Sequence, residues 1–203
     1  MMFNYNRRYY LKREGDRRHL NTAIAITEVC QREGLDTRSF LDIGCASGSL
    51  LDAIRKIVAN PTLCGIDHGD VPKNRFINGA VFVDLDLDLV NGDSVKSNEI
   101  LASGFDVVTS IEVVEHVNQK NEKGLVEMFA STSKGLVFLS AARPRQRGYG
   151  HVNCASREHW IELFAQAGLP FRKMATEDFC TIMEALGAGD KENLMVFGKG
   201  KRE

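Results

Sequence analysis

Apolar residues occur in short runs that alternate with longer segments in which they recur every three or four positions. The short runs predict strands at residues 39–43, 62–66, 80–83, 105–110, 134–139, 171–175 and 194–197. The longer segments predict helices at residues 19–34, 50–58, 94–102, 114–132, 157–167 and 177–186. Because strands and helices alternate, we expect an α/β domain with a mostly parallel sheet and helices on both faces.

The first apolar run leads into a glycine turn. Residues 40–48 read Phe-Leu-Asp-Ile-Gly-Cys-Ala-Ser-Gly, which predicts a buried strand, a tight turn and the start of a helix. Gly44 can adopt backbone angles closed to other residues, and neither Gly44 nor Gly48 has a side chain to keep a ligand away. The helix start also presents N–H groups that lack partners within the helix. The segment therefore predicts a site for a nucleotide-like ligand.

The glycine spacing argues against a dinucleotide site. Such a site carries G-x-G-x-x-G, but alignment on Gly44 places Ala46 and Ser49 at the second and third glycine positions. Acidic residues at positions 42, 67, 84 and 106 lie at or near the ends of predicted strands. Since the carboxyl ends of parallel strands share one edge, we expect these carboxylates to meet at a ligand site.

A second group of chemically active residues begins at Glu112. The segment Glu-Val-Val-Glu-His is expected on a helix, where Glu112, Glu115 and His116 would share one face. Two carboxylates and an imidazole could bind a divalent cation, or His116 could act alone as a general base near neutral pH. His151 lies in a loop that we expect at the same edge of the sheet.

The turn resembles the D-x-G-x-x-x-G motif of the class I S-adenosylmethionine-dependent methyltransferases, and the resemblance extends over roughly residues 38–199. It implies a single Rossmann-like domain with a mostly parallel seven-stranded sheet and an antiparallel last strand. Residues 1–20 would form a lid or substrate segment, and residues 21–203 would bind the cofactor. S-adenosylmethionine would be the methyl donor and S-adenosylhomocysteine the product.

The resemblance also assigns cofactor contacts at the ends of the first four predicted strands. Asp42 would orient the loop and the ligand's amino group, and Asp67 would accept hydrogen bonds from the ribose. His68, Asp84 and Leu85 would surround the adenine. At the end of the fourth strand, Ser110 and Ile111 would line the sulfonium. The loop residues would pass the methionine moiety, and they are Gly44, Cys45, Ala46 and Gly48.

The acid and histidine segment resembles the E-x-x-E-H of two groups, the ubiquinone-biosynthesis O-methyltransferases and the small-RNA 2′-O-methyltransferases. Carried over, the ligands of a magnesium or manganese ion would be Glu112, Glu115, His116 and His151. The histidine-rich signature of the RNA enzymes is not reproduced around His151. Two alternatives stay open: His116 and His151 act as catalytic groups without metal, or Glu115 and His116 only fix the loop.

The expected acceptor is a small polar molecule, of the sugar, nucleotide or phenol type, methylated on oxygen or nitrogen. Arg143 and Arg147, in an arginine-rich loop, and Tyr10, in the aromatic and basic N-terminal segment, are candidate substrate contacts. One alternative is a metal-assisted RNA ribose 2′-O-methyltransferase. Another is a non-catalytic, cofactor-binding scaffold subunit.

Composition limits the classes of partner and the cellular location, but it does not identify the acceptor. The chain of 203 residues has a formal net charge of −1, so no overall basic field favours nucleic acid or membranes. No apolar run approaches the roughly 18 residues of a membrane helix. Five cysteines without a C-x-x-C pair argue against disulfides and zinc knuckles and favour a reduced, cytoplasmic location. Nothing in the sequence indicates an oligomeric state.

Overall fold

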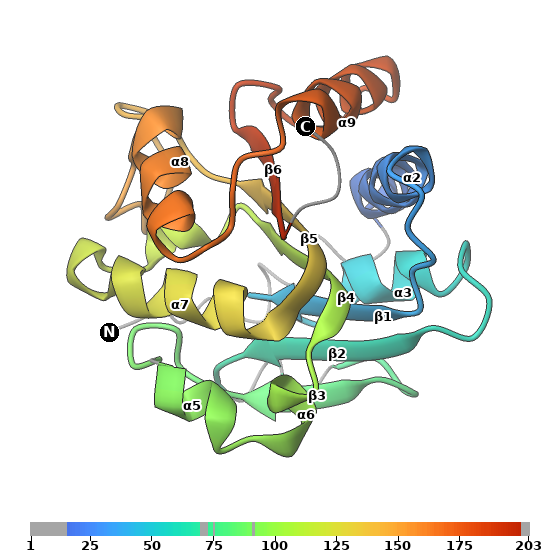
Figure 1. Ribbon diagram of the computed structural model, residues 1–203, viewed down its shortest axis with the longest axis horizontal. Helices are drawn as coiled ribbons and strands as arrows, with labels where there is room; N and C mark the ends of the chain where they lie inside the picture. The colour runs from blue at the N-terminus through green and yellow to red at the C-terminus, as the bar shows by residue number, and fades with distance from the viewer. Residues whose placement is uncertain (1–15, 70–72, 75, 91, 200–203) are drawn as a thin grey trace.

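The computed structural model describes residues 16–69, 73–74, 76–90 and 92–199. Within them, one sheet has six strands in the order β3-β2-β1-β4-β5-β6 (Figure 1). Pairing is parallel throughout except between β5 and β6, which is antiparallel. The strands are β1 (Ser39–Ile43), β2 (Thr62–Asp67), β3 (Val81–Asp84), β4 (Phe105–Ile111), β5 (Ser133–Ser140) and β6 (Leu194–Gly198).

Helices cover both faces of the sheet (Figure 1). One layer contains α2 (Arg17–Arg32), α3 (Ser49–Ile54) and α9 (Lys173–Ala185). The other contains α5 (Gly92–Lys96), α6 (Glu99–Ala102), α7 (Glu122–Thr132) and α8 (Arg157–Gln166). Two short 3₁₀ turns, η1 (Val114–His116) and η2 (Gln119–Asn121), lie between β4 and α7.

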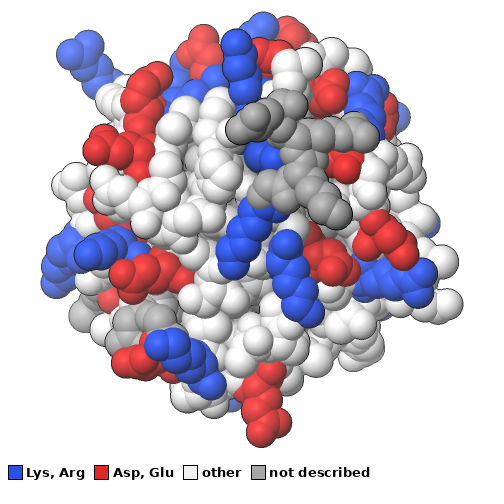
Figure 2. All heavy atoms as spheres, in the orientation of Figure 1, with Lys and Arg blue, Asp and Glu red and all other residues white. Residues whose placement is uncertain are grey.

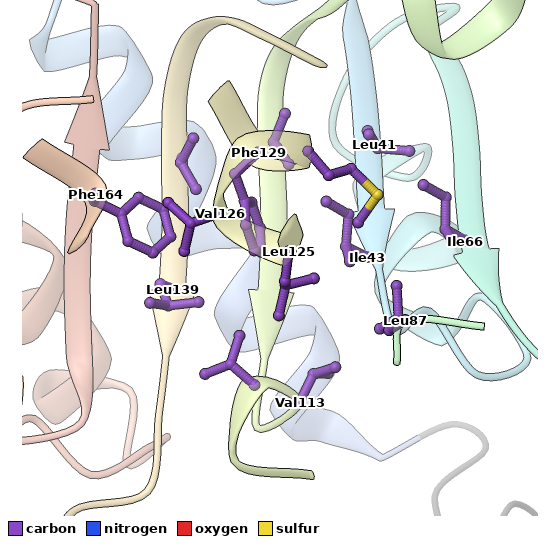
Figure 3. Packing of buried hydrophobic residues seen from close by; sticks show 14 of the residues in the cluster. Leu41, Ile43, Ile66, Leu87, Val113, Leu125, Val126, Phe129, Leu139 and Phe164 are labelled. Atoms are coloured by element: carbon purple, nitrogen blue, oxygen red, sulfur yellow. The ribbon is translucent and has the colours of Figure 1, made fainter. Parts of the chain in front are cut away.

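Strand residues pack alternately into the two layers, as the pleat of a strand requires. Leu41 and Val108 face α7 and α8, while their neighbours Phe40 and Val107 face α2 and α9. Both faces are buried, so the strands read as continuous apolar runs rather than alternating ones. Figure 3 shows the α7 side, where Leu125 and Phe129 lie over the strands.

The predicted architecture is confirmed with a correction in the strand count. The described residues form six strands, not seven, because Phe171 makes only an isolated bridge to Phe197. The strand predicted at 171–175 gives way to α9, which begins at Lys173. Apolar side chains at Ala175, Phe179 and Ile182 follow a helical period and are buried, so helical packing prevails there.

Three predicted helices are shorter or divided. The helix expected at 114–132 consists of η1, η2 and α7, because Val117 and Asn118 have extended backbone angles. The helix expected at 94–102 is divided into α5 and α6, and Asn98 caps the second by accepting from Ile100 N. The helix after the glycine turn ends at Ile54 rather than at residue 58.

The sheet order places the candidate site. From β1 the chain moves outward to β2 and β3, then crosses back to β4 on the other side of β1. Ligands bind outside the carboxyl ends of strands at such a switch point. Asp106 lies at the opposite edge, near the start of β4, where its Oδ2 accepts from the backbone of Arg38 and Ser39. The expectation that Asp106 joins the other carboxylates was therefore wrong.

On the face drawn in Figure 2, acidic and basic side chains are interspersed. Among the described residues, no helix has the length and apolar character needed to cross a membrane.

Candidate functional site

The glycine turn between β1 and α3 has three left-handed residues in alternation. Gly44 has φ +79°, Ala46 has φ +50° and Gly48 has φ +83°. The conformation at Gly44 and Gly48 agrees with the reason given for glycine there, whereas Ala46 adopts it despite its side chain. Asp67 holds this strained segment, because its Oδ2 accepts from Ala46 N at 2.7 Å.

Asp42 is the buried acid beneath the turn. Its side chain is 5% exposed, and Thr109 on the adjacent strand β4 donates to its Oδ1 at 2.7 Å. Burial raises the pKa of Asp42 to about 7, with the Thr109 hydrogen bond opposing and the charge of Asp67 adding to the rise. A cationic group bound at the end of β1 would therefore stabilise the ionised form of this buried carboxyl.

The three acids expected at the cofactor site, Asp42, Asp67 and Asp84, lie on adjacent strands. Asp67 and Asp84 are register partners at the ends of β2 and β3, and His68 Nδ1 lies 2.9 Å from Asp84 Oδ1. The hydrogen bond to His68 lowers the pKa of Asp84, while burial raises the pKa of Asp67. Leu85 N–H, expected to contact the adenine ring, donates instead to the Asp67 carbonyl at 3.0 Å.

Two residues expected to touch the ligand are used in packing. Ser110 is fully buried and donates to the Ile43 carbonyl at 3.0 Å, so its hydroxyl does not line the edge. Cys45 is 4% exposed, and burial raises the pKa of its thiol. Ile111, the last residue of β4, is partly buried against the α2, α3 and α9 layer.

The missing side chains of the glycines make room for protein atoms. A Cβ at Gly44 would overlap both methyl groups of Val113. A Cβ at Gly48 would lie 2.8 Å from the ring of Phe76, and one at Gly65 would lie 2.6 Å from Cys45 Sγ. At Gly44 and Gly48, where a close approach of a ligand was predicted, Val113 and Phe76 approach the backbone closely, and Cys45 does so at Gly65.

A second cluster joins η1 to the loop after β5. Ligand atoms of Glu115, His116 and His151 all lie within 4.8 Å of one another. The Glu115 carbonyl accepts from Val152 N and Asn153 N, which fixes the loop beside η1. The expected acid and histidine constellation therefore exists, but a 3₁₀ turn and a loop form it rather than one helix face.

Glu115 is the buried acid of this cluster. Its side chain is 0% exposed, and neither carboxylate oxygen has a hydrogen-bond partner among the described residues. Burial, and then the charge of Glu112, raises the pKa of Glu115 to about 8. A buried carboxylate left in this state calls for a cation or a proton, because isolated charge is costly away from water.

The two histidines are oriented by backbone carbonyls. His116 Nδ1 lies 3.0 Å from the Gly150 carbonyl, which can only accept, so Nδ1 carries the hydrogen and Nε2 the lone pair. Burial lowers the pKa of His116. His151 Nδ1 lies 3.3 Å from the Gln146 carbonyl, and its Nε2 lies 4.0 Å from Glu115 Oε1.

Glu112 is not among the three clustered residues, although its charge acts on Glu115 and His116. Its backbone is left-handed, with φ +57°, so the chain turns sharply after β4. Its Oε1 accepts from the Ser140 hydroxyl at 2.7 Å and from Asn193 Nδ2 at 3.4 Å. The structure thus brings together three of the four predicted ligands and engages the fourth, Glu112, with β5 and the start of β6.

The candidate substrate residues have different environments. Arg143 forms ion pairs with Asp190 and Glu192, so its charge is matched within the protein. Arg147 is exposed, in the same loop as His151. Tyr10 and most of the expected lid lie outside the described residues, and residues 17–20 form the start of α2.

Several contributors were not singled out from the sequence. Thr109 could have been found from strand pairing, because it lies opposite Asp42 in the β1–β4 register. Cys154, whose Sγ lies 3.5 Å from His151 Nδ1, gives no sequence signal of that contact. Gly148 packs against the His151 ring so closely that any Cβ would overlap it.

Comparison with known proteins connects this geometry to a family. Residues 5–174 match the family described as "Methyltransferase domain". The ubiquinone biosynthesis O-methyltransferase of Shewanella pealeana is 29% identical over 118 residues, 57% of this chain and 48% of that enzyme. Its counterpart in Pseudomonas aeruginosa strain UCBPP-PA14 is 29% identical over 154 residues, 74% of this chain and 63% of that one. The chain spans about half the length of the first of these relatives.

Solved structures show the same fold. An S-adenosylmethionine-bound amino pentose methyltransferase from Micromonospora echinaspora has a TM-score of 0.69 at 15% identity, covering 98% of this chain and 100% of that one. An S-adenosylmethionine-dependent methyltransferase from Archaeoglobus fulgidus has a TM-score of 0.63 at 18% identity, covering 94% and 99%. At these identities the likeness concerns the fold alone.

Proposed function

The chain belongs to the methyltransferase-domain family, and from that membership we propose that it transfers the methyl group of S-adenosylmethionine to an oxygen of a small polar acceptor. The relatives named as ubiquinone biosynthesis O-methyltransferases support oxygen as the accepting atom. One observation carries the proposal: Asp42, Asp67 and Asp84 follow three adjacent strands at the edge where β4 leads into the Glu115, His116 and His151 cluster.

The cofactor part rests on charge and on backbone shape. The donor's amino and sulfonium groups are cationic, and Asp42 and Asp67 are buried carboxyls at that edge. Asp42 would bind the amino group, and Asp67 would accept from the ribose with lone pairs not used by Ala46 N and His68 N. The His68–Asp84 pair would border the adenine.

The acceptor part rests on proton removal. A sulfonium methyl is already electrophilic, so the protein must align the reactants and take a proton from the acceptor hydroxyl. His116 suits this task, because the Gly150 carbonyl holds its Nδ1 hydrogen and the neutral ring then has its lone pair on Nε2. The lowered pKa of His116 keeps the imidazole neutral, and therefore able to accept a proton, at pH 7.

A divalent cation fits the same residues. The unpartnered, fully buried carboxylate of Glu115 and two imidazoles form a two-histidine, one-carboxylate donor set, which suits transition metals better than magnesium, an ion that prefers oxygen ligands. As the alternative to His116 acting as the base, we propose that Glu115, His116 and His151 hold such an ion, with Glu112 outside its shell. The lone pair of His116 would then bind the ion and would not take the proton of the acceptor. When bound, the ion would lower the pKa of the acceptor hydroxyl and fix its oxygen.

Calorimetric titration tests both parts separately. S-adenosylhomocysteine is titrated into the protein, and Mn²⁺ is then titrated into the saturated sample, with a chelator control. We expect wild type to give both heats. The control variant Glu177→Gln, which changes an exposed residue of α9, should also give both. Glu115→Gln should keep the first heat and lose the second.

Each other result has a defined meaning. Absence of S-adenosylhomocysteine binding by a folded sample would overturn the methyltransferase proposal. Binding of the cofactor product without a Mn²⁺ heat in wild type would overturn the metal part and leave His116 as the base. Cofactor-product binding that is unaffected by Asp42→Ala would show that the cofactor residues are misassigned.

A further inference from the structure

The loop at residues 143–151, hereafter the arginine loop, connects the end of β5 to His151. It carries three arginines within five positions, at 143, 145 and 147. Gln146, between the second and third, holds His151 through its carbonyl at 3.3 Å from Nδ1. The loop is therefore joined to the histidine cluster through Gln146 and His151.

The three arginines are not equivalent. Arg143 pairs with Asp190 and Glu192, before β6, and this anchors the start of the loop. Arg145 and Arg147 are exposed, and within the described part of the chain neither has a carboxylate partner. The charge of these two guanidinium groups is thus not balanced by an ion pair with any described residue.

The backbone of Arg145 has an energetically unfavourable, left-handed conformation. Arg145 has φ +70°, a conformation that costs an ordinary residue on the order of 1 kcal/mol and that glycine would adopt freely. The chain places an arginine there, next to a hollow of about 530 Å³ lined by Arg143, Pro144, Arg145 and Gln146. A strained arginine beside an open hollow points to a ligand that needs its guanidinium.

From these observations we infer that Arg145 and Arg147 form an anion subsite that binds a phosphate or carboxylate group of the methyl acceptor. Guanidinium forks match both groups by paired hydrogen bonds. Arg143 then serves as the anchor of the loop rather than as a substrate contact. This inference rests on the proposed function, because it assigns the acceptor class for that same site.

A small anionic acceptor is favoured over a nucleic acid. Polynucleotide binding draws on an extended track of basic side chains along the phosphate backbone. Within the arginine loop only Arg145 and Arg147 lack a described carboxylate partner, and on the face drawn in Figure 2 basic and acidic side chains are interspersed. Two guanidinium groups suit one anionic group.

The test uses the full chain saturated with S-adenosylhomocysteine, with the Arg Nε–Hε signals read by ¹H–¹⁵N NMR. Sodium phosphate, sodium acetate and a single-stranded RNA oligonucleotide are titrated separately at constant ionic strength. We expect saturable shifts of the Arg145 and Arg147 signals with phosphate or acetate. Arg145→Gln and Arg147→Gln should each weaken this binding about tenfold.

Arg38→Gln is the matched control, because Arg38 is exposed and lies just before β1 at the opposite edge of the sheet. Phosphate affinity that exceeds acetate affinity would assign a phosphorylated acceptor, and the reverse would assign a carboxylate. Shifts no larger than those caused by chloride, or equal affinity in Arg145→Gln, Arg147→Gln and wild type, would overturn the inference. RNA binding with a salt dependence above that of two phosphates would also overturn it. Loss of S-adenosylhomocysteine binding would instead count against the proposed function.

Discussion

Replacing Asp42 by Asn should stabilise the protein at neutral and higher pH and weaken cofactor binding. The carboxyl is almost fully buried, and the Thr109 hydroxyl donates a hydrogen bond to its Oδ1. An asparagine Oδ1 can accept the same bond, while the amide has no charge to desolvate. The substitution therefore removes the free-energy cost of burying an ionised group, while the side chain keeps its shape.

The size of the effect follows from the pKa. Burial raises the pKa of Asp42 from 3.8 to about 7, which corresponds to about 4 kcal/mol of lost stability once the group is ionised. Because the folded pKa is the higher one, this loss starts near pH 4, where the unfolded chain ionises. It grows as the pH rises and is complete above about pH 7. Between pH 5 and pH 8 we expect wild type to lose about 2 to 3 kcal/mol through this group.

Urea unfolding of wild type and Asp42→Asn at pH 5 and pH 8 measures this difference directly. The neutral amide does not titrate, so the stability gap between the two proteins should widen in favour of the variant by that amount. S-adenosylhomocysteine affinity should fall about tenfold in the variant, because a charged hydrogen bond is lost. A gap that stays constant between the two pH values would refute the claim that Asp42 bears an ionisation cost.

Two further substitutions test the reassignment of residues from ligand contact to packing. Gly65→Ala would place a Cβ 2.6 Å from Cys45 Sγ and 2.8 Å from Phe76 Cε2, so we expect a loss of about 1 to 3 kcal/mol in urea unfolding. The double variant Gly65→Ala, Cys45→Ala should recover part of it, and an unperturbed single variant would contradict the packing. Ser110→Ala removes a buried hydroxyl that donates to the Ile43 carbonyl, so stability should fall by about 1 kcal/mol. Calorimetry should show S-adenosylhomocysteine affinity unchanged in Ser110→Ala, and a large loss of affinity would restore Ser110 to the cofactor site.

Local patterns were sufficient to predict most of the sheet. Five of the predicted strands and the antiparallel β6 agree with the structure, because each is a short apolar run, and all but the edge strand β3 are mostly buried on both faces. The strand predicted at 171–175 was wrong, because α9 begins within this apolar run, at Lys173. Likewise Glu112, Glu115 and His116 fit a helical face, but the extended angles at Val117 end the 3₁₀ turn that holds the last two.

The chemical roles were harder to predict than the elements, because they depend on contacts between distant segments. The sequence around Arg143 does not show that Asp190 and Glu192 neutralise it, and nothing near Gly44 shows that Val113 fills its space. The cluster of Glu115 and His151 depends on the Glu115 carbonyl accepting from Val152 and Asn153. Such partners are selected by the tertiary fold, so residue type and spacing alone do not identify them.

The electrostatic design of the edge explains why destabilising acids persist there. Asp42 and Asp67 are both buried with raised pKa values, so each lowers the stability of the ligand-free protein. Neither is needed to complete the core, since a neutral side chain of the same shape would fill the same volume. What a neutral side chain lacks is the ability to bind a cation. A buried Asp42 beside a strained turn agrees with the proposed binding of the donor's cationic amino group, because that binding would offset the free-energy cost of burying the carboxylate. Asp67 has a further role, since it also holds Ala46 N.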